Sequence, residues 1–139
     1  MEDAENSMRF YTVGNMYLSS IQQGIQAAHC LGEMFLGHRH NDNFIDWLNE
    51  HKTMICLNGG NNANLLALHT LFTNAQNPGY PVAHFREDEQ SMAGMLTCVG
   101  IIVPEKIYGI DLADANTWSG LSSWEVELAT ALKKLPMAR

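Results

Sequence analysis

The spacing of apolar residues predicts a long amphipathic helix near the start of the chain, over residues 19–35 with the sequence SSIQQGIQAAHCLGEMF. Ser20, followed three residues later by Gln23, predicts a capping box at its start. The apolar residues recur at helical spacing and share one face: Ile21, Ile25, Ala28, Leu31 and Phe35. We expect that face to point into the core and the rest of the chain to be organised around this helix.

A short strand is predicted directly before the helix. Residues 9–13, RFYTV, are β-branched and aromatic, and residues 14–19 form the connecting loop. The first backbone N–H groups of a helix have no partner within it, and open α/β proteins hold ligands at such junctions. The sequence therefore predicts a ligand site at the start of the helix, although the pattern does not name the ligand.

A second junction of this kind follows residues 53–57, TMICL, which we expect to be a central strand. The next residues are 58–62, NGGNN, and a leucine-rich helix over residues 63–74. Glycines allow positive φ and asparagines cap helices, so turn chemistry alone explains this pattern. A ligand cradle that includes Asn58 is the alternative, although the lysine and the serine or threonine of a phosphate-binding P-loop are missing.

The remaining elements extend the alternation of strands and helices. They are a short amphipathic helix over residues 43–51, an edge strand over 81–85, a strand buried on both faces over 95–103, an aperiodic stretch over 105–120, and a helix capped by Ser122 and Glu125 that ends near Leu135. Such alternation predicts an α/β sandwich. We expect a single domain over residues 1–139, with residues 1–8 as a flexible arm.

Composition is consistent with one globular domain, because 46% of the 139 residues are hydrophobic. No apolar run reaches the roughly 18 residues of a transmembrane helix. The first residues, MEDAENS, are acidic and polar, so we expect no secretory signal and a cytoplasmic location. Cys30, Cys56 and Cys98 lie in apolar segments without CxxC spacing, and we interpret them as buried free thiols; a catalytic cysteine is the alternative.

The formal charge of −7 disfavours a nucleic-acid partner, because such binding depends on a basic face that neutralises phosphates. A local basic pocket is still compatible with this balance. His38 and His40, together with Asp42, have a spacing that could hold a metal ion. An exposed polar loop is the simpler interpretation, and we expect neither a metal nor a cofactor.

Three stretches carry a resemblance to a known family. They are GIQAAHC, in which Gln26 and His29 match the helix motif Ala-Ala-Gln-x-x-His; the strand and leucine-rich helix over 54–71; and FREDEQ followed by Ala93-Gly94 and LTCVGIIVP, in which Gln90, Gly94, Thr97 and Gly100 fit. Over residues 9–104 the chain resembles the peptidyl-tRNA hydrolase 2 superfamily. The resemblance implies a three-layer α/β sandwich, with a four-stranded mixed sheet flanked by helices, and leaves residues 105–139 as a C-terminal helical extension.

The departures from this family concern its chemistry. In the family, a lysine before the helix and an aspartate in the last turn are associated with hydrolysis. Here no lysine precedes the helix, and the aspartate position is Phe85, with Glu87 or Asp88 nearby. Without a cation to stabilise a developing oxyanion, ester cleavage loses about 3 kcal/mol or more. We therefore expect a fold that keeps the cleft and has lost the catalytic chemistry.

Each candidate side chain also has a structural interpretation. Gln26 and His29 are either a ligand donor and a catalytic base or buried groups hydrogen-bonded in the interior, and we favour the structural roles. Arg86 suits bidentate contact with phosphate, but the acidic residues after it make a salt-bridged turn equally reasonable. We expect ligand contacts from the start of the helix, the second junction and the last turn: Tyr17, Ser19, Ser20, Gln22, Gln26, Asn58, Phe85, Arg86 and Gln90.

Three functions follow. The first is non-catalytic capture of a small nucleotide-like ligand, by analogy with phage anti-defence proteins that sequester immune signalling nucleotides. The second is hydrolysis of peptidyl-tRNA or a related ester, with His29 and either Glu87 or Asp88 replacing the family's catalytic groups. The third is an inhibitor that binds a protein partner. The resemblance also implies a homo-oligomer, because members of the family often pair.

Overall fold

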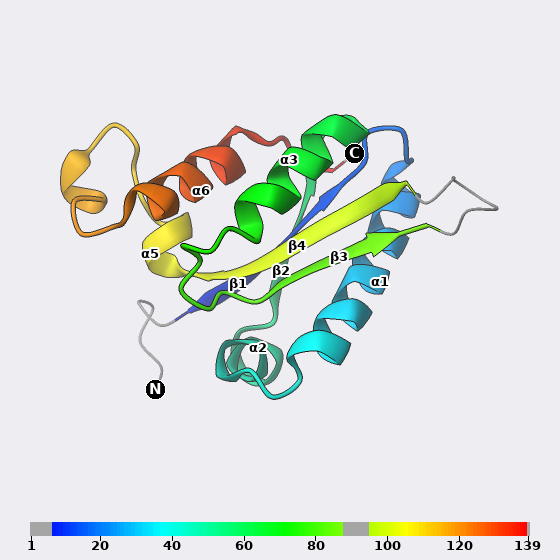
Figure 1. Ribbon diagram of the computed structural model, residues 1–139, viewed down its shortest axis with the longest axis horizontal. Coiled ribbons are helices and arrows are strands. Elements are labelled where there is room, and N and C mark those ends of the chain that lie inside the picture. The colour runs from blue at the N-terminus through cyan, green and yellow to red at the C-terminus, as the bar shows by residue number, and fades with distance from the viewer. Residues whose placement is uncertain (1–6, 88–94, 139) are drawn as a thin grey trace.

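The computed structural model describes residues 7–87 and 95–138, which form one four-stranded sheet with helices on both faces (Figure 1). The strands are β1 (Met8–Gly14), β2 (Thr53–Asn58), β3 (Val82–Arg86) and β4 (Leu96–Pro104), in the order β2-β1-β4-β3. β1 and β2 are parallel, whereas β4 is antiparallel to both β1 and β3. The expected α/β fold with a four-stranded mixed sheet is thereby confirmed.

The helices divide into two layers. One layer covers one face of the sheet and consists of α1 (Ser20–His38) and α2 (Asp42–Asp46). The helix α2 continues as the π-helical turn η2 (Trp47–His51). The other layer contains α3 (Asn62–Phe72), α5 (Glu105–Tyr108), the 3-10 turn η3 (Ala115–Thr117) and α6 (Ser123–Lys134). Its helices α3, α5 and α6 pack on the opposite face of the sheet. The expected C-terminal helix is confirmed, and its capping box joins Ser122 to Glu125 as the sequence predicts.

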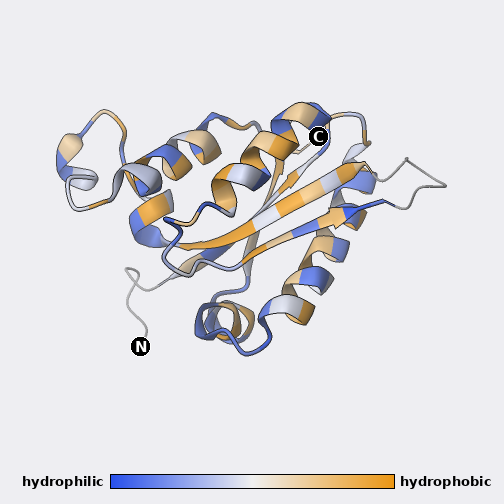
Figure 2. Cartoon of the chain, viewed as in Figure 1, coloured by the Kyte–Doolittle hydropathy of each residue, from blue (hydrophilic) through white to orange (hydrophobic). Residues whose placement is uncertain are grey.

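The alternation of side chains along the strands separates two apolar cores. Phe10 of β1 and its partner Ile102 of β4 face α1 and α2. Their neighbours Tyr11 and Ile101 face α3 and α6 instead. β4 is buried on both sides, which its continuous hydrophobic sequence predicts (Figure 2). None of the helices in the described part of the chain is long and apolar enough to cross a membrane.

The prediction for the buried face of α1 is wrong. Ile21 and Ile25 have relative exposures of 77% and 51%. Ala28 and Phe35 are also exposed, and Leu31 is only half-buried. The buried side chains of this helix are Gln23, Gln26, Ala27, Cys30 and Met34. The inward glutamines are stabilised by hydrogen bonds: Gln23 Nε2 donates to Leu18 O at 3.0 Å, and Gln26 is held by partners on the sheet.

The capping prediction for α1 is shifted by one residue. Ser19 is the N-cap, and its Oγ accepts from the Gln22 N–H at 3.1 Å while the Gln22 side chain accepts from the Ser19 N–H. Gln23 is not available for the reciprocal bond, because its side chain points inward to Leu18. Ser20 is therefore the first residue of the helix and not its cap.

Other expected segments differ in smaller ways. The aperiodic stretch contains α5 and η3. Most of the expected arm lies outside the described residues, but Met8 is buried as the first residue of β1. The cysteines are free; Cys30 and Cys98 are buried as expected, and Cys56 is only half-buried. Ala138 N–H donates to Cys56 O at 3.0 Å, so the end of the chain covers the outer edge of β2.

Candidate functional site along the β3 strand

β3 is an edge strand, and α1 lies beside it on one face of the sheet (Figure 1). Contacts at three levels show that α1 and β3 run in opposite directions. These are Gln26 with Glu87 near the start of α1, His29 with Phe85 in its middle, and His38 with Val82 at its end. An edge strand lined along its length by one helix forms a groove whose wall carries both side chains and unpaired strand backbone.

The first contact belongs to a buried polar network. Gln26 Nε2 donates to Glu87 Oε2 at 3.1 Å, and Gln26 Oε1 accepts from Thr97 Oγ1 at 3.1 Å. Thr97, which is fully buried in β4, also lies 3.2 Å from the carbonyl oxygen of Phe85. Both ends of the Gln26 amide are thus engaged within the protein. This is the structural role that the sequence favoured, and it ties the helix to two strands.

The second contact is an aromatic stack. The rings of His29 and Phe85 are nearly parallel, with centroids 4.5 Å apart and an interplanar angle of 11°. His29 is exposed, so the expectation of an interior, hydrogen-bonded histidine is wrong. The reason is the orientation of α1: its inward positions are taken by Gln26 and Cys30, which leaves position 29 at the rim of the groove. The flat, polar-edged surface that results is suited to stacking.

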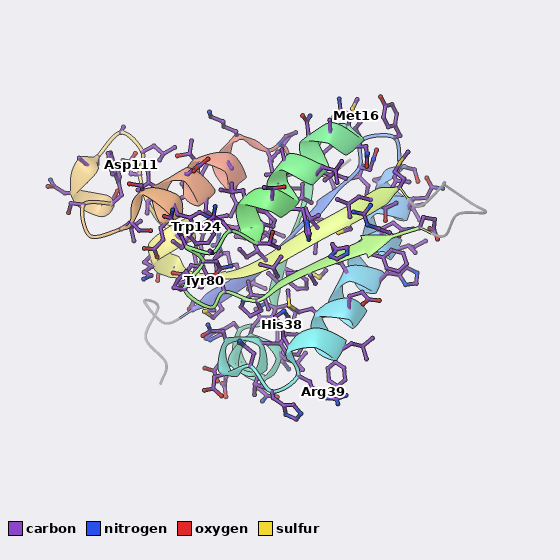
Figure 3. The ribbon with its side chains drawn as sticks, in the orientation of Figure 1. Met16, His38, Arg39, Tyr80, Asp111 and Trp124 are labelled. Atoms are coloured by element: carbon purple, nitrogen blue, oxygen red, sulfur yellow. The ribbon has the colours of Figure 1, made fainter. Side chains whose placement is uncertain are left out.

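A pocket of about 360 Å³ opens where the second half of α1 meets β3. It is lined by residues from both elements: Glu33, Gly37, His38, Val82, Ala83, His84, Phe85 and Arg86. The side chain of His38, the last residue of α1, turns toward β3, and its Nε2 lies 2.9 Å from Val82 O (Figure 3). Of the residues that the sequence singled out as ligand contacts, Phe85 and Arg86 line this pocket.

Histidines converge on β3 from several elements. The ring of His84 contacts His69 of α3, with centroids 4.6 Å apart in an edge-to-face arrangement. His29, His38, His69 and His84, which are four of the six histidines in the chain, therefore lie on or directly against this strand or its side chains. Burial lowers the pKa of His69, and the positive charges of His84 and Arg86 lower it further. The lining of the β3 pocket thus combines the guanidinium of Arg86, imidazole side chains and the carboxylate of Glu33.

The topology brings the other predicted ligand residues to one end of the sheet. β1, β2 and β3 point in the same direction, so their carboxyl ends share that end. Tyr17, Ser19, Ser20 and Gln22 follow β1, but Ser19 and Gln22 are occupied with each other in the capping box. Tyr17 is 70% exposed. These four are not among the residues that line the β3 pocket, and Gln90 lies outside the described residues.

The second predicted junction forms a separate pocket. Its volume is about 310 Å³, and its lining includes Asn58, Gly60 and Asn64. The Asn58 side chain accepts from Gly60 N–H at 2.9 Å, and Gly60 adopts a φ of 83°. Asn61 caps α3, so the turn chemistry predicted for NGGNN is present. β2 is at the opposite edge of the sheet from β3, and the two pockets therefore do not combine into one site.

The sequence did not identify His84, Glu33 or His69 as site residues, and it did not place His38 in a pocket. His84 alternates with Phe85 on a five-residue strand, where a lone histidine carries no signal. Its neighbour His69 is 15 residues away in the chain, on a helix of the opposite layer. The sequence allows two interpretations of His38, His40 and Asp42, a metal site and an exposed polar loop. His38 is half-buried and bonded to β3, so its side chain does not belong to an exposed loop. Among described residues no group of three metal-ligating side chains forms.

Comparison with models of known protein families and with curated protein sequences finds no match for this chain. The fold and the pocket therefore define the class: an α/β protein with a four-stranded mixed sheet and a histidine-rich groove along an edge strand.

Proposed function

We propose that this chain is a non-catalytic binding protein that captures a small nucleotide-like ligand in the β3 pocket. The observation that carries the proposal is the combination within one pocket of Arg86, His84 and His38 with the aromatic ring of Phe85. A volume of about 360 Å³ is within the range of roughly 300–1,000 Å³ for small-ligand pockets. The guanidinium of Arg86 and the imidazole donors beside an aromatic ring match the phosphate and the base of a nucleotide.

The roles of the individual groups follow from their chemistry. Arg86 presents a planar set of N–H donors that fits a phosphate in bidentate fashion. Imidazoles such as that of His84 add further donors. The backbone groups of β3 that point away from β4 are a third source of hydrogen bonds. Pro81 O pairs with Ile102 N of β4, and the direction of the backbone groups alternates along a strand, so the groups of every second residue point outward. Phe85 is half-buried and offers part of its ring for stacking.

The charge of the chain favours a small ligand over a long polyanion. At −7 the protein repels nucleic acid at a distance, and duplex or tRNA binding needs many phosphate contacts. A single mononucleotide or cyclic nucleotide needs only the few donors that the pocket supplies. Stoichiometric capture without turnover would suit sequestration of an immune signalling nucleotide in the cytoplasm, as phage anti-defence proteins do.

One observation supports the rival hydrolase function. Gln26 contacts Glu87 and Phe85 contacts His29, so both candidate catalytic groups lie near the end of β3. Catalysis would require both groups to act on one water or hydroxyl. Instead, a Glu87 oxygen accepts from Gln26, and the His29 ring lies flat on Phe85. These contacts favour a role for both side chains in the wall of a binding site over a role in catalysis, and we rank hydrolysis second.

The proposal is tested by titration calorimetry with cyclic dinucleotides and with adenosine mono-, di- and triphosphate. The native chain should bind one of these at one equivalent and release it unchanged. Arg86→Gln should weaken binding about tenfold or more, since a charge-assisted hydrogen bond contributes about 1.5–3 kcal/mol. Lys134→Gln makes the same charge change on α6, which lies on the opposite face of the sheet, and should leave affinity unchanged. Equal losses in both variants, or conversion of the nucleotide, would refute the proposal.

A further inference from the structure

The outer face of α1 is a continuous apolar stripe on the protein surface. Ile21, Ile25, Phe35 and Leu36 all have relative exposures of 48–77%. Ala28 and Gly32 lie between them and are exposed as well. Single exposed apolar residues are ordinary, but a contiguous stripe along a five-turn helix marks an interaction surface. The polar residues that would normally face solvent, Gln23 and Gln26, are buried instead.

The stripe has the spacing of a coiled-coil seam. Positions 21, 25, 28, 32 and 35 follow intervals of four, three, four and three residues. This is the heptad spacing by which one helix packs along another, and it is narrower than the face of an ordinary surface helix. The stripe therefore fits one partner helix that runs along α1.

The charge distribution of α1 permits a second copy of this chain as the partner. The 19 residues of α1 contain Glu33 as their one acidic residue and contain no lysine or arginine. Two chains that each carry −7 repel one another over most of their surfaces. They meet least repulsion where both present an uncharged, apolar helix.

The sizes of the side chains select an antiparallel arrangement. With a two-fold axis through Ala28, the numbers of facing positions sum to 56, so Ile21 opposes Phe35. Ile25 is then level with Leu31, one residue from the seam position Gly32. A Cβ built on Gly32 meets nothing within 4 Å, so this position offers a hole for Ile25 of the other copy. A parallel pair would oppose the two glycines and leave that hole empty, and it would align the two helix dipoles unfavourably.

We propose that two copies of this chain pair through α1, packed antiparallel about Ala28. The pairing surface is independent of the ligand proposed for the β3 pocket, since its five seam positions are not among the residues that line that pocket. The two helices would bury the stripe that the isolated chain leaves exposed. The interaction is isologous, so each contact in the seam away from Ala28 occurs twice.

Light scattering coupled to gel filtration tests the pairing at several protein concentrations. The native chain should elute with twice the mass of one chain. Ile25→Lys should convert it to a monomer, because two lysines would enter the seam. Leu66→Lys is the matched control, since Leu66 is exposed by 40% on α3, in the opposite layer. A monomeric native chain, or a dimer that persists in Ile25→Lys, would overturn the proposal.

Disulfide formation tests the register. Ala28→Cys places two thiols at the two-fold axis, and mild oxidation should yield a covalent dimer. Leu36→Cys is the control: the paired sites would be 16 residues apart along the helices, or about 24 Å, which is too far for a disulfide. The native chain, with Cys30 and Cys98 buried and Cys56 half-buried, sets the background. Failure of Ala28→Cys to cross-link, or equal cross-linking of Leu36→Cys, would overturn the antiparallel register.

Discussion

Gln26 Oε1 accepts a hydrogen bond from Thr97 Oγ1 at 3.1 Å, although the two residues are 71 positions apart in the chain. This bond joins the inward face of α1 to the start of β4. The same Gln26 side chain also donates to Glu87, so this amide holds the inward face of the helix together with the buried Cys30 and Met34. That orientation of the helix exposes the apolar stripe and places His29 and Glu33 along the β3 groove.

Removal of this amide should destabilise the fold. Gln26→Ala removes the hydrogen bonds to Thr97 and Glu87, and two such bonds contribute about 1–3 kcal/mol together. The free energy of unfolding, measured by urea titration, should fall by that amount. Gln76→Ala removes the same atoms from an exposed turn and should change stability by less than about 0.5 kcal/mol. Equal effects of the two substitutions would contradict the assigned role of Gln26.

Gly59 and Gly24 are a second matched pair of positions at which a substitution tests the packing. A Cβ at Gly59 would overlap Val13 Cγ1 and lie 2.7 Å from Leu65 Cδ2. Both neighbours are fully buried, so Gly59→Ala should lower the unfolding free energy by about 1–3 kcal/mol. At Gly24 in α1 a Cβ meets nothing within 4 Å, and Gly24→Ala should raise it by about 0.5–1 kcal/mol. The signs should therefore be opposite in thermal or urea unfolding, and a shared sign would show that Gly59 is not closely packed.

The buried pair of Tyr80 and Glu125 predicts acid sensitivity. The Tyr80 hydroxyl donates to Glu125 Oε2 at 2.8 Å, and Lys106 lies 3.2 Å from the same oxygen (Figure 3 shows Tyr80 beside Trp124). Burial acts to raise the pKa of Glu125, but hydrogen bonds from Ser122, Tyr80 and Lys106 outweigh it and lower the pKa below 4.5. A lowered carboxyl pKa stabilises the fold above the unfolded-state value and loses that contribution as the pH falls through the folded-state value.

Glu125→Gln should therefore be less stable than the native chain at pH 7, and the difference should shrink at pH 3 and below. Urea titrations at both values measure it. Glu127→Gln is an exposed control on the same helix and should show a much smaller difference at either pH. A Glu125→Gln deficit that stays constant with pH would show that the carboxylate charge does not contribute.

The histidines beside β3 predict a second pH dependence. The pKa of His69 is lowered by burial and by the charges of His84 and Arg86. The unfolded chain therefore binds this proton more readily, so the stabilisation is complete above about pH 6.5 and declines as the pH falls below it. His69→Gln should flatten this slope between pH 7 and 5, whereas His40→Gln, at an exposed position, should not. An unchanged slope in His69→Gln would contradict the arrangement.

Much of the sheet could be predicted from the sequence because its signals are local. The continuous apolar run of β4 identifies a strand buried on both faces, and Asn61 and Ser122 mark the helices that they cap. The boundaries of the strands and of α3 and α6 differ from the prediction by one or two residues. Local chemistry decides such features, and no distant partner is needed.

The rotation of α1 could not be predicted in this way. Its apolar residues have a regular helical period, so periodicity alone assigns them to the core. The partners that hold Gln26 inward come from β4 and the end of β3, far away in the sequence. The pocket was missed in part for the same reason: His38, His84 and His69 come together only through tertiary structure. Arg86 and Phe85 were found because they directly end a predicted strand.

Ligand capture is tested by mass spectrometry of small molecules released by heat from the purified native protein. We expect one equivalent of a nucleotide-like compound per chain from the native protein and from Lys134→Gln. We expect a strongly reduced amount from Arg86→Gln. An empty supernatant from the native protein, together with the absence of binding in the nucleotide titrations, would contradict the proposed capture of a nucleotide-like ligand.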